Sequence, residues 1–284
     1  MLRVLSLNVT NGGQRLQQPV FERLEALAPD LITLQELRSD TAPSWRPRLA
    51  SAGYTTIDTF ELARQHAIPH PGRFREDGLL IASRWPLHAL DPTRHGLPWP
   101  ERLLSATTLH PTRTLELHTV HVPNASTGIN LYAKGQTQLG RERLMKKLET
   151  FEGTYQALAS PNGTPRLLTG DFNTPHTEHP DGTIRYWQHS CPAPLRAELA
   201  TRWLEAERNV FEGLRHHGMR DAYRALHGPT VTAFSWEHGS SKNRYRYDHV
   251  FASPELTPTA CNYLYEFSLN ANHHAAILAD LTDP

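Results

Sequence analysis

The chain has 284 residues, enough for a large hydrophobic core, and its 29 Lys and Arg residues balance its 29 Asp and Glu residues. Without a net charge, no overall field favours DNA, acidic substrates or an anionic membrane. The two cysteines provide neither a disulfide framework nor a metal-ligand spacing. The N-terminal apolar run is too short and polar for a signal peptide, and no run approaches membrane-spanning length. We therefore expect a cytoplasmic protein without membrane insertion.

Two early strands each lead to a polar residue. The apolar run 2–7 predicts a strand that stops at Asn8, and the run 30–34 predicts a second strand that leads to Glu36. A helix over about 19–28 separates them. The carboxylate of Glu36 is a candidate functional group, and an ordinary strand-end carboxylate is the alternative.

The next segment combines arginines with histidines and prolines. After a helix over 45–52 and a strand over 54–60, the stretch 64–75 contains three arginines, two histidines and two prolines. This composition predicts a surface loop in which Arg73 and Arg75 could contact substrate phosphates. A solvated loop without a function is the alternative.

Three further strands, over 78–83, 103–109 and 114–120, precede a histidine at a strand end. By alternation, His121 faces the same way as Thr119, while residues 118 and 120 face the other way. His121 is thus a candidate proton donor or phosphate contact.

The stretch 167–175 follows a long helix predicted over 134–159. Apolar residues run into a glycine, after which Asp171 and Asn173 lie two positions apart, so both side chains point to one side. A carboxylate beside a neutral amide suits a metal-bound water or a phosphate oxygen, where two carboxylates would repel. An Asx turn that satisfies only its own backbone is the alternative.

The polar stretch 174–194 is long for a loop in a compact domain, which indicates function or disorder. Its histidines and carboxylates match no standard zinc spacing, so we expect a substrate-facing loop. It contains His176, Glu178, His179, Asp181 and His189.

The C-terminal part predicts helices over 195–217 and 221–227, followed by strands. These strands cover 232–236, 245–252, 260–267 and 274–281. Asp248 lies among aromatic and apolar neighbours, where a carboxylate needs a partner or a role. Strands come in runs with helices between the runs, which favours two packed sheets flanked by helices.

Polar residues thus recur at strand ends along the whole chain, as expected if these ends converge on one site. Carboxylates can hold a divalent cation and orient an attacking water, while amides and imidazoles hold phosphate oxygens. The set suits metal-assisted phosphoester hydrolysis, and its members are Asn8, Glu36, His121, Asp171, Asn173, Asp248 and His274.

Seven sequence pieces together resemble the endonuclease/exonuclease/phosphatase superfamily over nearly the full chain. They are 7–9 (Leu-Asn-Val), 34–36 (Leu-Gln-Glu), 78–84 (Gly-Leu-Leu-Ile-Ala-Ser-Arg), 121–124 (His-Val-Pro-Asn), 170–173 (Gly-Asp-Phe-Asn), 246–253 (Arg-Tyr-Asp-His-Val-Phe-Ala-Ser) and 274–281. Within the superfamily, 218–227 followed by Phe-Ser-Trp at 234–236 is most similar to the exonuclease-III-type abasic-site endonucleases. The resemblance implies an α+β fold, namely a four-layer α/β/β/α sandwich of two mainly antiparallel sheets flanked by helices. It also implies a single catalytic domain spanning 1–284.

The resemblance also implies roles, position by position. Glu36 would be the principal ligand of Mg²⁺ or Mn²⁺, with Asn8 beside it. Asp171 would orient the attacking water next to Asn173, supported by Asp248. His274 would contact the scissile phosphate.

Two positions depart from the abasic-site pattern. His121 stands where those enzymes have tyrosine and where pancreatic-type deoxyribonucleases and several phosphatases have histidine. The closing Ser-Asp-His motif reads Asn-His-His, which places His273 where relatives have a carboxylate ligand. Because imidazole suits later transition metals better than it suits Mg²⁺, His273 favours Mn²⁺. The substrate contacts would be Arg73, Arg75, Asn124 and Trp236.

We therefore expect a divalent-metal phosphodiesterase that acts on DNA, as a monomer, in abasic-site repair. One alternative is a phosphatase for a small phosphorylated metabolite or lipid headgroup, since the fold serves both. A second alternative is an inactive phosphate-binding relative that lost turnover with the carboxylate at position 273.

Overall fold

The computed structural model describes residues 1–66, 77–94, 96–159, 162–268 and 273–282. Arg73 and Arg75, the expected phosphate contacts, lie outside these ranges. Within them, no helix is both long and apolar enough to cross a membrane.

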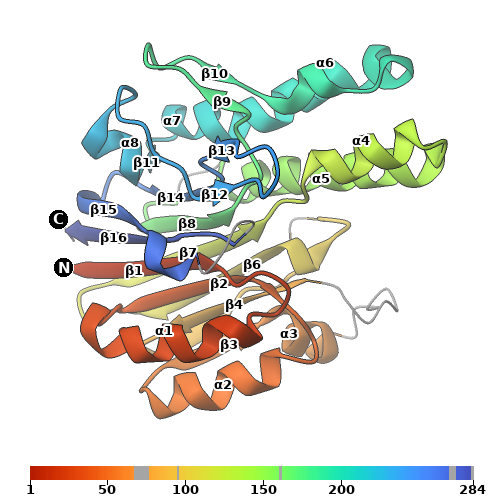
Figure 1. Cartoon of the computed structure of the whole chain (residues 1–284). Helices are drawn as coiled ribbons and strands as arrows, with labels where there is room; N and C mark the ends of the chain where they lie inside the picture. The colour runs from red at the N-terminus through yellow and green to blue at the C-terminus, as the bar shows by residue number, and fades with distance from the viewer. Residues whose placement is uncertain (67–76, 95, 160–161, 269–272, 283–284) are drawn as a thin grey trace.

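The first sheet contains both ends of the described chain as neighbouring strands (Figure 1). Its strand order is β15 (Thr257–Leu264), β16 (Ala276–Thr282), β1 (Leu2–Asn8), β2 (Leu31–Leu37), β4 (Gly78–Ser83) and β3 (Thr55–Asp58). Only β1 and β2 are parallel, and the other neighbours are antiparallel.

The second sheet also has six strands and one parallel pair, β7 with β8. Its order is β11 (Arg220–Asp221), β14 (Asp248–Ala252), β8 (Arg166–Asp171), β7 (Thr114–His121), β6 (Leu103–Leu109) and β5 (Leu87–Ala89). Two small antiparallel pairs lie outside both sheets, namely β9 (Thr177–Glu178) with β10 (Ile184–Arg185), and β12 (Trp236–Glu237) with β13 (Arg244–Tyr245).

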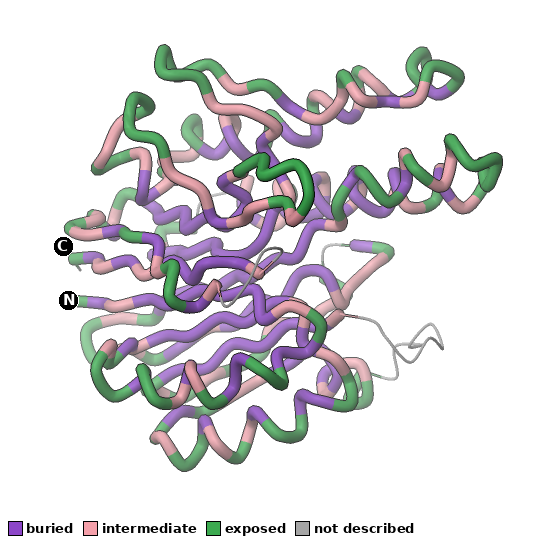
Figure 2. Tube along the Cα trace, viewed as in Figure 1, coloured by how far each residue is buried: buried purple, intermediate pink, exposed green. Residues whose placement is uncertain are grey.

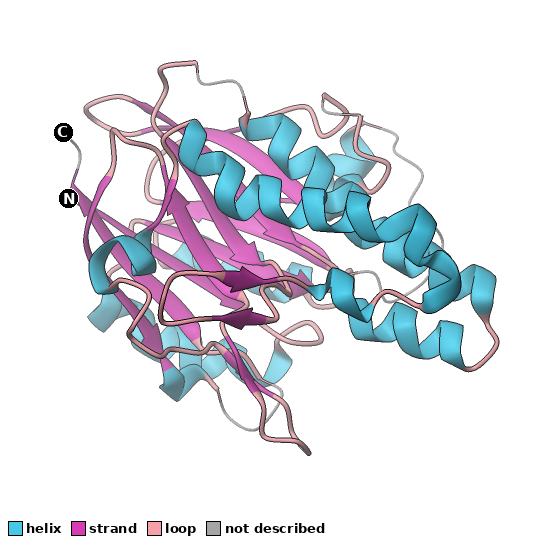
Figure 3. Ribbon diagram, turned by 90° about the horizontal axis from the view of Figure 1, so that it is seen from above, coloured by secondary structure: helices cyan, strands magenta, loops and turns pink. Residues whose placement is uncertain are grey.

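Helices cover the outer faces of the two sheets. On the first sheet these are α1 (Gln14–Leu27), α2 (Ala42–Ser51) and α3 (Thr59–Gln65). On the second they are α4 (Ala125–Ala133), α5 (Thr137–Leu158), α6 (Arg196–Arg208), a π-helical turn (Asn209–Gly213) and α7 (Leu214–His216), with α8 (Ala222–His227) at the β14 and β15 edge. The helices α4, α5 and α6 extend beyond the ends of the strands (Figures 1 and 3).

The hydrophobic residues form separate layers that match this arrangement. Leu2, Val4 and Ile81 of the first sheet pack against Leu117 and Val250 of the second in the central layer. A second layer joins the first sheet to α1 and α2, and a third joins the second sheet to α5 and the π-helical turn. Figure 2 shows buried residues along the strands and exposed residues on the outer sides of the helices. The predicted α/β/β/α sandwich is confirmed.

Among the strand predictions, the one over 232–236 was wrong, because only Trp236 of this range lies in a strand. The strand predicted over 54–60 ends at Asp58, because the Asp58 carboxylate accepts hydrogen bonds from the N–H groups of Phe60 and Glu61 and so caps α3. The helix predicted over 134–159 is confirmed as α5, and a separate helix that was not predicted, α4, precedes it and begins after Asn124. The stretch 174–194 contains the β9–β10 pair and two 3₁₀ turns.

Gly170 gives the first prediction, because it lies directly before Asp171 in β8 with a φ of 138°. A Cβ atom at this position would lie 2.0 Å from the carbonyl oxygen of Val120 on β7. Gly170→Ala should therefore destabilise the protein by about 3 kcal/mol in denaturant unfolding.

Gly163→Ala is the matched control, since Gly163 also has a positive φ (78°) but nothing within 4 Å of the added Cβ. It should cost only about 1–2 kcal/mol. Equal losses for the two variants would contradict the close approach of β8 to β7.

Candidate active site

The sheet topology brings six polar side chains to one edge of the sandwich. The parallel pairs β1–β2 and β7–β8 place the carboxyl ends of all four strands at this edge. Because β14 and β16 run antiparallel to their neighbours, their first residues arrive at the same edge. The residues brought together are Asn8, Glu36, His121, Asp171, Asp248 and His274.

Glu36 reaches the site through a break in the regular strand. The register of β2 against β4 shifts between Leu34 and Leu37, and Glu36 adopts a left-handed φ of 59°. In a regular strand, Glu36 would face away from its neighbour Gln35, whose amide bonds to Ser6 and Thr119 between the sheets. The bulge turns the carboxylate to the site instead, where its Oε2 accepts from the Asn11 N–H at 3.0 Å.

Asn8 joins the two sheets through its side-chain amide. Its Nδ2 donates to Oε1 of Glu36 at 3.1 Å and to Oδ2 of Asp171 at 2.9 Å. Its Oδ1 accepts from the backbone N–H of Thr10 at 2.9 Å, which fixes the orientation of the amide. Asn8 thus holds the two carboxylates side by side, and its expected contact with a metal stays a prediction.

Asp171 is buried and held on both oxygens. Oδ1 accepts from the Asn173 N–H at 2.8 Å, and Oδ2 accepts from the Asn173 side-chain amide at 3.1 Å. Asn173 has a left-handed φ of 47° and also donates to the carbonyl of Val122. Burial, with the charges of Asp248 and Glu36, raises the pKa of Asp171 to about 7 against the opposing charge of His274.

Asp248 lies directly across from Asp171 in the β8–β14 ladder. Like charges in this position destabilise a sheet, so a positive charge is needed nearby. His274 supplies it: its Nδ1 lies 2.7 Å from Oδ2 of Asp248, and its Nε2 lies 3.8 Å from Oδ2 of Asp171. Burial disfavours the charged ring, but the two carboxylates outweigh burial and raise the pKa of His274 to about 9.

His121 is a neutral hydrogen-bond donor rather than a cation. Nη1 of Arg102, a group that can only donate, lies 2.8 Å from its Nδ1, so the ring proton is on Nε2. Nε2 lies 3.6 Å from Oε1 of Glu36 and 3.9 Å from Oδ2 of Asp171. Burial and the charge of Arg102 lower the pKa of His121 to about 3.

Sequence reasoning missed two charged residues at this site. Arg102 directly precedes β6, whose Leu103 pairs with Val120, so only the strand register places it beside His121. Asp77 directly precedes β4, and its Oδ2 lies 3.9 Å from Nη1 of Arg102. Burial and the charge of Glu36 raise the pKa of Asp77 to about 6.

A row of aromatic rings begins beside His274. The Trp236 ring lies 6.4 Å from that of His274 and stacks on Tyr247 at 5.7 Å. Tyr247 stacks on Tyr245 at 5.0 Å, and Tyr245 lies 6.0 Å from Trp187. We call Trp236, Tyr247, Tyr245 and Trp187 the aromatic row.

The remaining predicted residues lie farther from the carboxylates. Asn124 is exposed and caps α4, accepting from the Thr127 N–H at 3.0 Å. His273 is partly buried, and burial lowers its pKa while the charge of Glu36 opposes this shift. The roles of both residues stay predictions.

The residues at this edge fit a divalent cation. Carboxylate oxygens of Glu36 and Asp171 lie within 4.8 Å of each other, as do those of Asp171 and Asp248, and one histidine, His121 or His274, accompanies each pair. Within the described ranges, His273 belongs to neither group. Oδ1 of Asp248 is buried, and none of the residues that the structure describes forms a hydrogen bond with it. Carboxylate-rich sets of this kind suit Mg²⁺ and Mn²⁺.

The position of His274 between two carboxylates gives a prediction for the metal-free protein. Its ring should titrate in NMR with a midpoint near pH 9, and Asp248→Asn should lower the midpoint by at least about one unit. A raised pKa means that the folded protein binds this proton more tightly than the unfolded chain does. The protonated His274 therefore contributes its full stabilisation of the folded state below about pH 6.5, and this contribution is lost as the pH rises through about 9.

The exposed Asp91 offers a control, since Asp91→Asn should leave the His274 midpoint unchanged. A wild-type midpoint below pH 7 would mean that the two carboxylates do not hold the imidazolium.

Solved structures share this fold over almost the whole chain. An AP endonuclease from Archaeoglobus fulgidus superposes with a TM-score of 0.66 at 18% identity, with 99% of each chain covered. A Neisseria 3′ phosphatase, NExo, solved as a variant bound to a product DNA hairpin, has a TM-score of 0.64 at 17% identity, covering 99% of this chain and 100% of that one. A humanized D. rerio TDP2 has a TM-score of 0.62 at 15% identity, covering 99% and 98%. At these identities the likeness concerns the fold.

The family of the protein follows from a comparison of its sequence. No curated protein matches the chain. A family model, however, matches residues 6–267, a range that includes every strand-end residue of the site except His274. The chain belongs to the Endonuclease/Exonuclease/phosphatase family, whose members are metal-dependent phosphoester hydrolases.

Proposed function

We propose that the protein hydrolyses phosphodiester bonds in DNA, with abasic-site repair as its most specific role. The family supplies the reaction class. Structural neighbours such as the Neisseria 3′ phosphatase, which was solved with a product DNA hairpin, support the choice of substrate.

Asp171 is suited to take the proton of the attacking water. Both of its oxygens are held by Asn8 and Asn173, so the carboxylate cannot rotate away from the site. Its raised pKa, about 7, makes it a stronger base than an exposed aspartate.

His274 and His121 are suited to the phosphate. The imidazolium of His274, fixed by Asp248, offers a positive charge, and the Nε2–H of His121 offers a neutral donor. A divalent cation held by Glu36 would neutralise phosphate charge and polarise the phosphoester.

The aromatic row is the observation that favours DNA over a small phosphoester. Aromatic side chains can stack on unpaired bases, and such stacking accepts any base. Because the row starts 6.4 Å from the His274 ring, a strand whose phosphate lies at His274 could extend its bases along Tyr245 and Trp187.

The phosphatase alternative rests on His121, which stands where abasic-site enzymes have tyrosine. A small phosphorylated substrate would use the same carboxylates and histidines but would not need the aromatic row. The inactive-relative alternative rests on His273 in place of a carboxylate.

Tyr245→Ala separates the substrate classes. With single-stranded DNA, KM should rise about tenfold, because base stacking contributes roughly 1–3 kcal/mol. With glycerophosphocholine, a phosphodiester that has no aromatic ring, KM and kcat should stay unchanged. A parallel panel should contain duplex DNA, abasic-site DNA and phosphomonoesters, each with Mg²⁺ and Mn²⁺.

Faster turnover of a phosphomonoester than of every DNA substrate would favour the phosphatase. An absence of turnover with both metals would favour the inactive relative.

Position 273 gives a prediction for metal preference. Wild-type activity should be higher with Mn²⁺ than with Mg²⁺, and His273→Asp should raise the Mg²⁺-supported rate by restoring a hard oxygen ligand. Steady-state rates at matched metal concentrations measure this, and the exposed His238 provides the control His238→Asp. Equal rates with both metals, unaffected by His273→Asp, would show that residue 273 does not reach the metal.

A further inference from the structure

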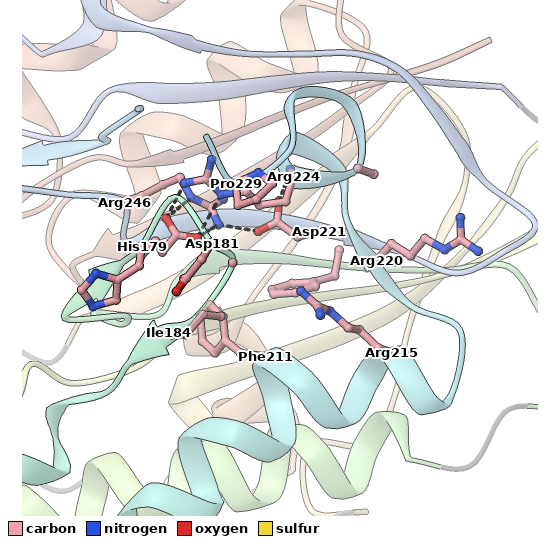
Figure 4. Close-up of a pocket in the computed structure, with 14 residues that line it drawn as sticks. His179, Asp181, Ile184, Phe211, Arg215, Arg220, Asp221, Arg224, Pro229 and Arg246 are labelled. Atoms are coloured by element: carbon pink, nitrogen blue, oxygen red, sulfur yellow. Dashed lines mark hydrogen bonds and ion pairs between the residues drawn. The ribbon is translucent and has the colours of Figure 1, made fainter. Parts of the chain in front are cut away.

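A cavity of about 530 Å³ lies at the outer face of the second sheet, and Figure 4 shows the residues that line it. It is bounded by the β9–β10 pair, the end of α7 and α8. The side chains of β14 alternate, so Phe251 packs in the outer layer and faces this cavity, whereas Val250 packs between the sheets. The cavity is therefore separate from Asp248 and the carboxylates beside it.

One wall of the cavity is a closed ionic network. Glu178 accepts paired hydrogen bonds from Arg246 at 2.8 and 2.6 Å and from Arg224 at 3.1 and 2.8 Å. Asp221 lies 2.8 Å from Arg246 and 3.0 Å from Nδ1 of His249. Burial opposes ionisation, yet Arg246 outweighs it and lowers the pKa of Glu178 to about 2. These two arginines and two carboxylates neutralise one another, so this wall is structural.

Arg215 also lines the cavity but takes no part in this ionic network. Its side chain extends from α7 towards the middle of the cavity, whereas that of Arg220 points away from it (Figure 4). Across the described ranges, the Arg215 guanidinium has no hydrogen-bond or ion-pair partner. The third carboxylate of the lining, Asp181, accepts hydrogen bonds from its own neighbour Thr183. Because Arg220 points away, Arg215 is the arginine of the lining that faces the cavity from outside the network.

The rest of the lining is apolar. Ile184, Phe211, Phe251 and Pro229 contribute to it. A volume of a few hundred Å³, with apolar walls and a few placed polar groups, is typical of sites for small organic molecules.

We propose that this cavity binds a small organic anion whose phosphate pairs with Arg215 and whose planar apolar body rests on Phe211 and Ile184. Guanidinium groups match phosphate oxygens with paired hydrogen bonds, and a desolvated apolar wall favours a ring system over free phosphate. A nucleoside monophosphate has both parts. The site is independent of the proposed DNA hydrolysis, because none of its lining residues belongs to the carboxylate site.

Calorimetric titration of the metal-free, full-length protein with adenosine 5′-monophosphate tests the proposal. The wild type should bind it, and adenosine and inorganic phosphate, each lacking one part, should bind at least about tenfold more weakly. Arg215→Glu should weaken binding at least about tenfold through loss of charge-assisted hydrogen bonds. Lys134→Glu, at an exposed position of the α4–α5 turn, makes the same charge change and should leave binding intact.

A steric variant keeps the test independent of charge. Ala225 is exposed on α8 and lines the cavity, so Ala225→Phe fills the cavity without disturbing the core. It should abolish binding while leaving DNA hydrolysis at the wild-type rate. The proposal is overturned if the wild type does not bind at millimolar ligand, if adenosine or phosphate binds as tightly, or if both variants bind as the wild type does.

Discussion

The positive charge of His274 between two buried carboxylates is the interaction on which the site depends. Asp171 and Asp248 face each other in the β8–β14 ladder, where two negative charges repel strongly in a medium of low dielectric constant. His274 bonds to Asp248 and faces Asp171, so the ring stabilises both carboxylates and is held charged by them. The antiparallel start of β16 delivers this ring to the place where the repulsion would be greatest.

At the Glu36 end of the site, no charged histidine among the described residues compensates the carboxylates. Asn8 donates to Glu36 and Asp171 together, which keeps the two carboxylates adjacent without a second imidazolium. Because His121 accepts from Arg102 and stays neutral, it adds a donor but no charge. Net negative charge therefore remains near Glu36, where a divalent cation is favoured.

Strand-end residues could be predicted from sequence because an apolar run with a polar last residue is a local signal. Asn8, His121 and Asp171 follow this pattern, and two parallel strand pairs bring them to one edge, where the antiparallel β14 adds its first residue, Asp248. The inward orientation of Glu36 could not be derived this way, because it depends on a bulge and a left-handed φ. Arg102 and Asp77 precede their strands, and only the antiparallel register places them near the site. The helix α4 was missed because its cap, Asn124, was assigned to substrate binding rather than to the N–H of Thr127.

The hydrolysis rate of Asp171→Ala tests the central claim most directly, namely that the strand-end carboxylates form one catalytic site. Asp171 is buried at a strand tip, and in the part of the chain that the structure describes its carboxylate accepts hydrogen bonds from Asn8 and Asn173, so its removal should leave the fold intact by circular dichroism. The rate on DNA with Mn²⁺ should fall on the order of 10²–10⁴-fold, as for the loss of a positioned base. A folded Asp171→Ala protein that keeps more than about half of the wild-type rate would contradict the shared site.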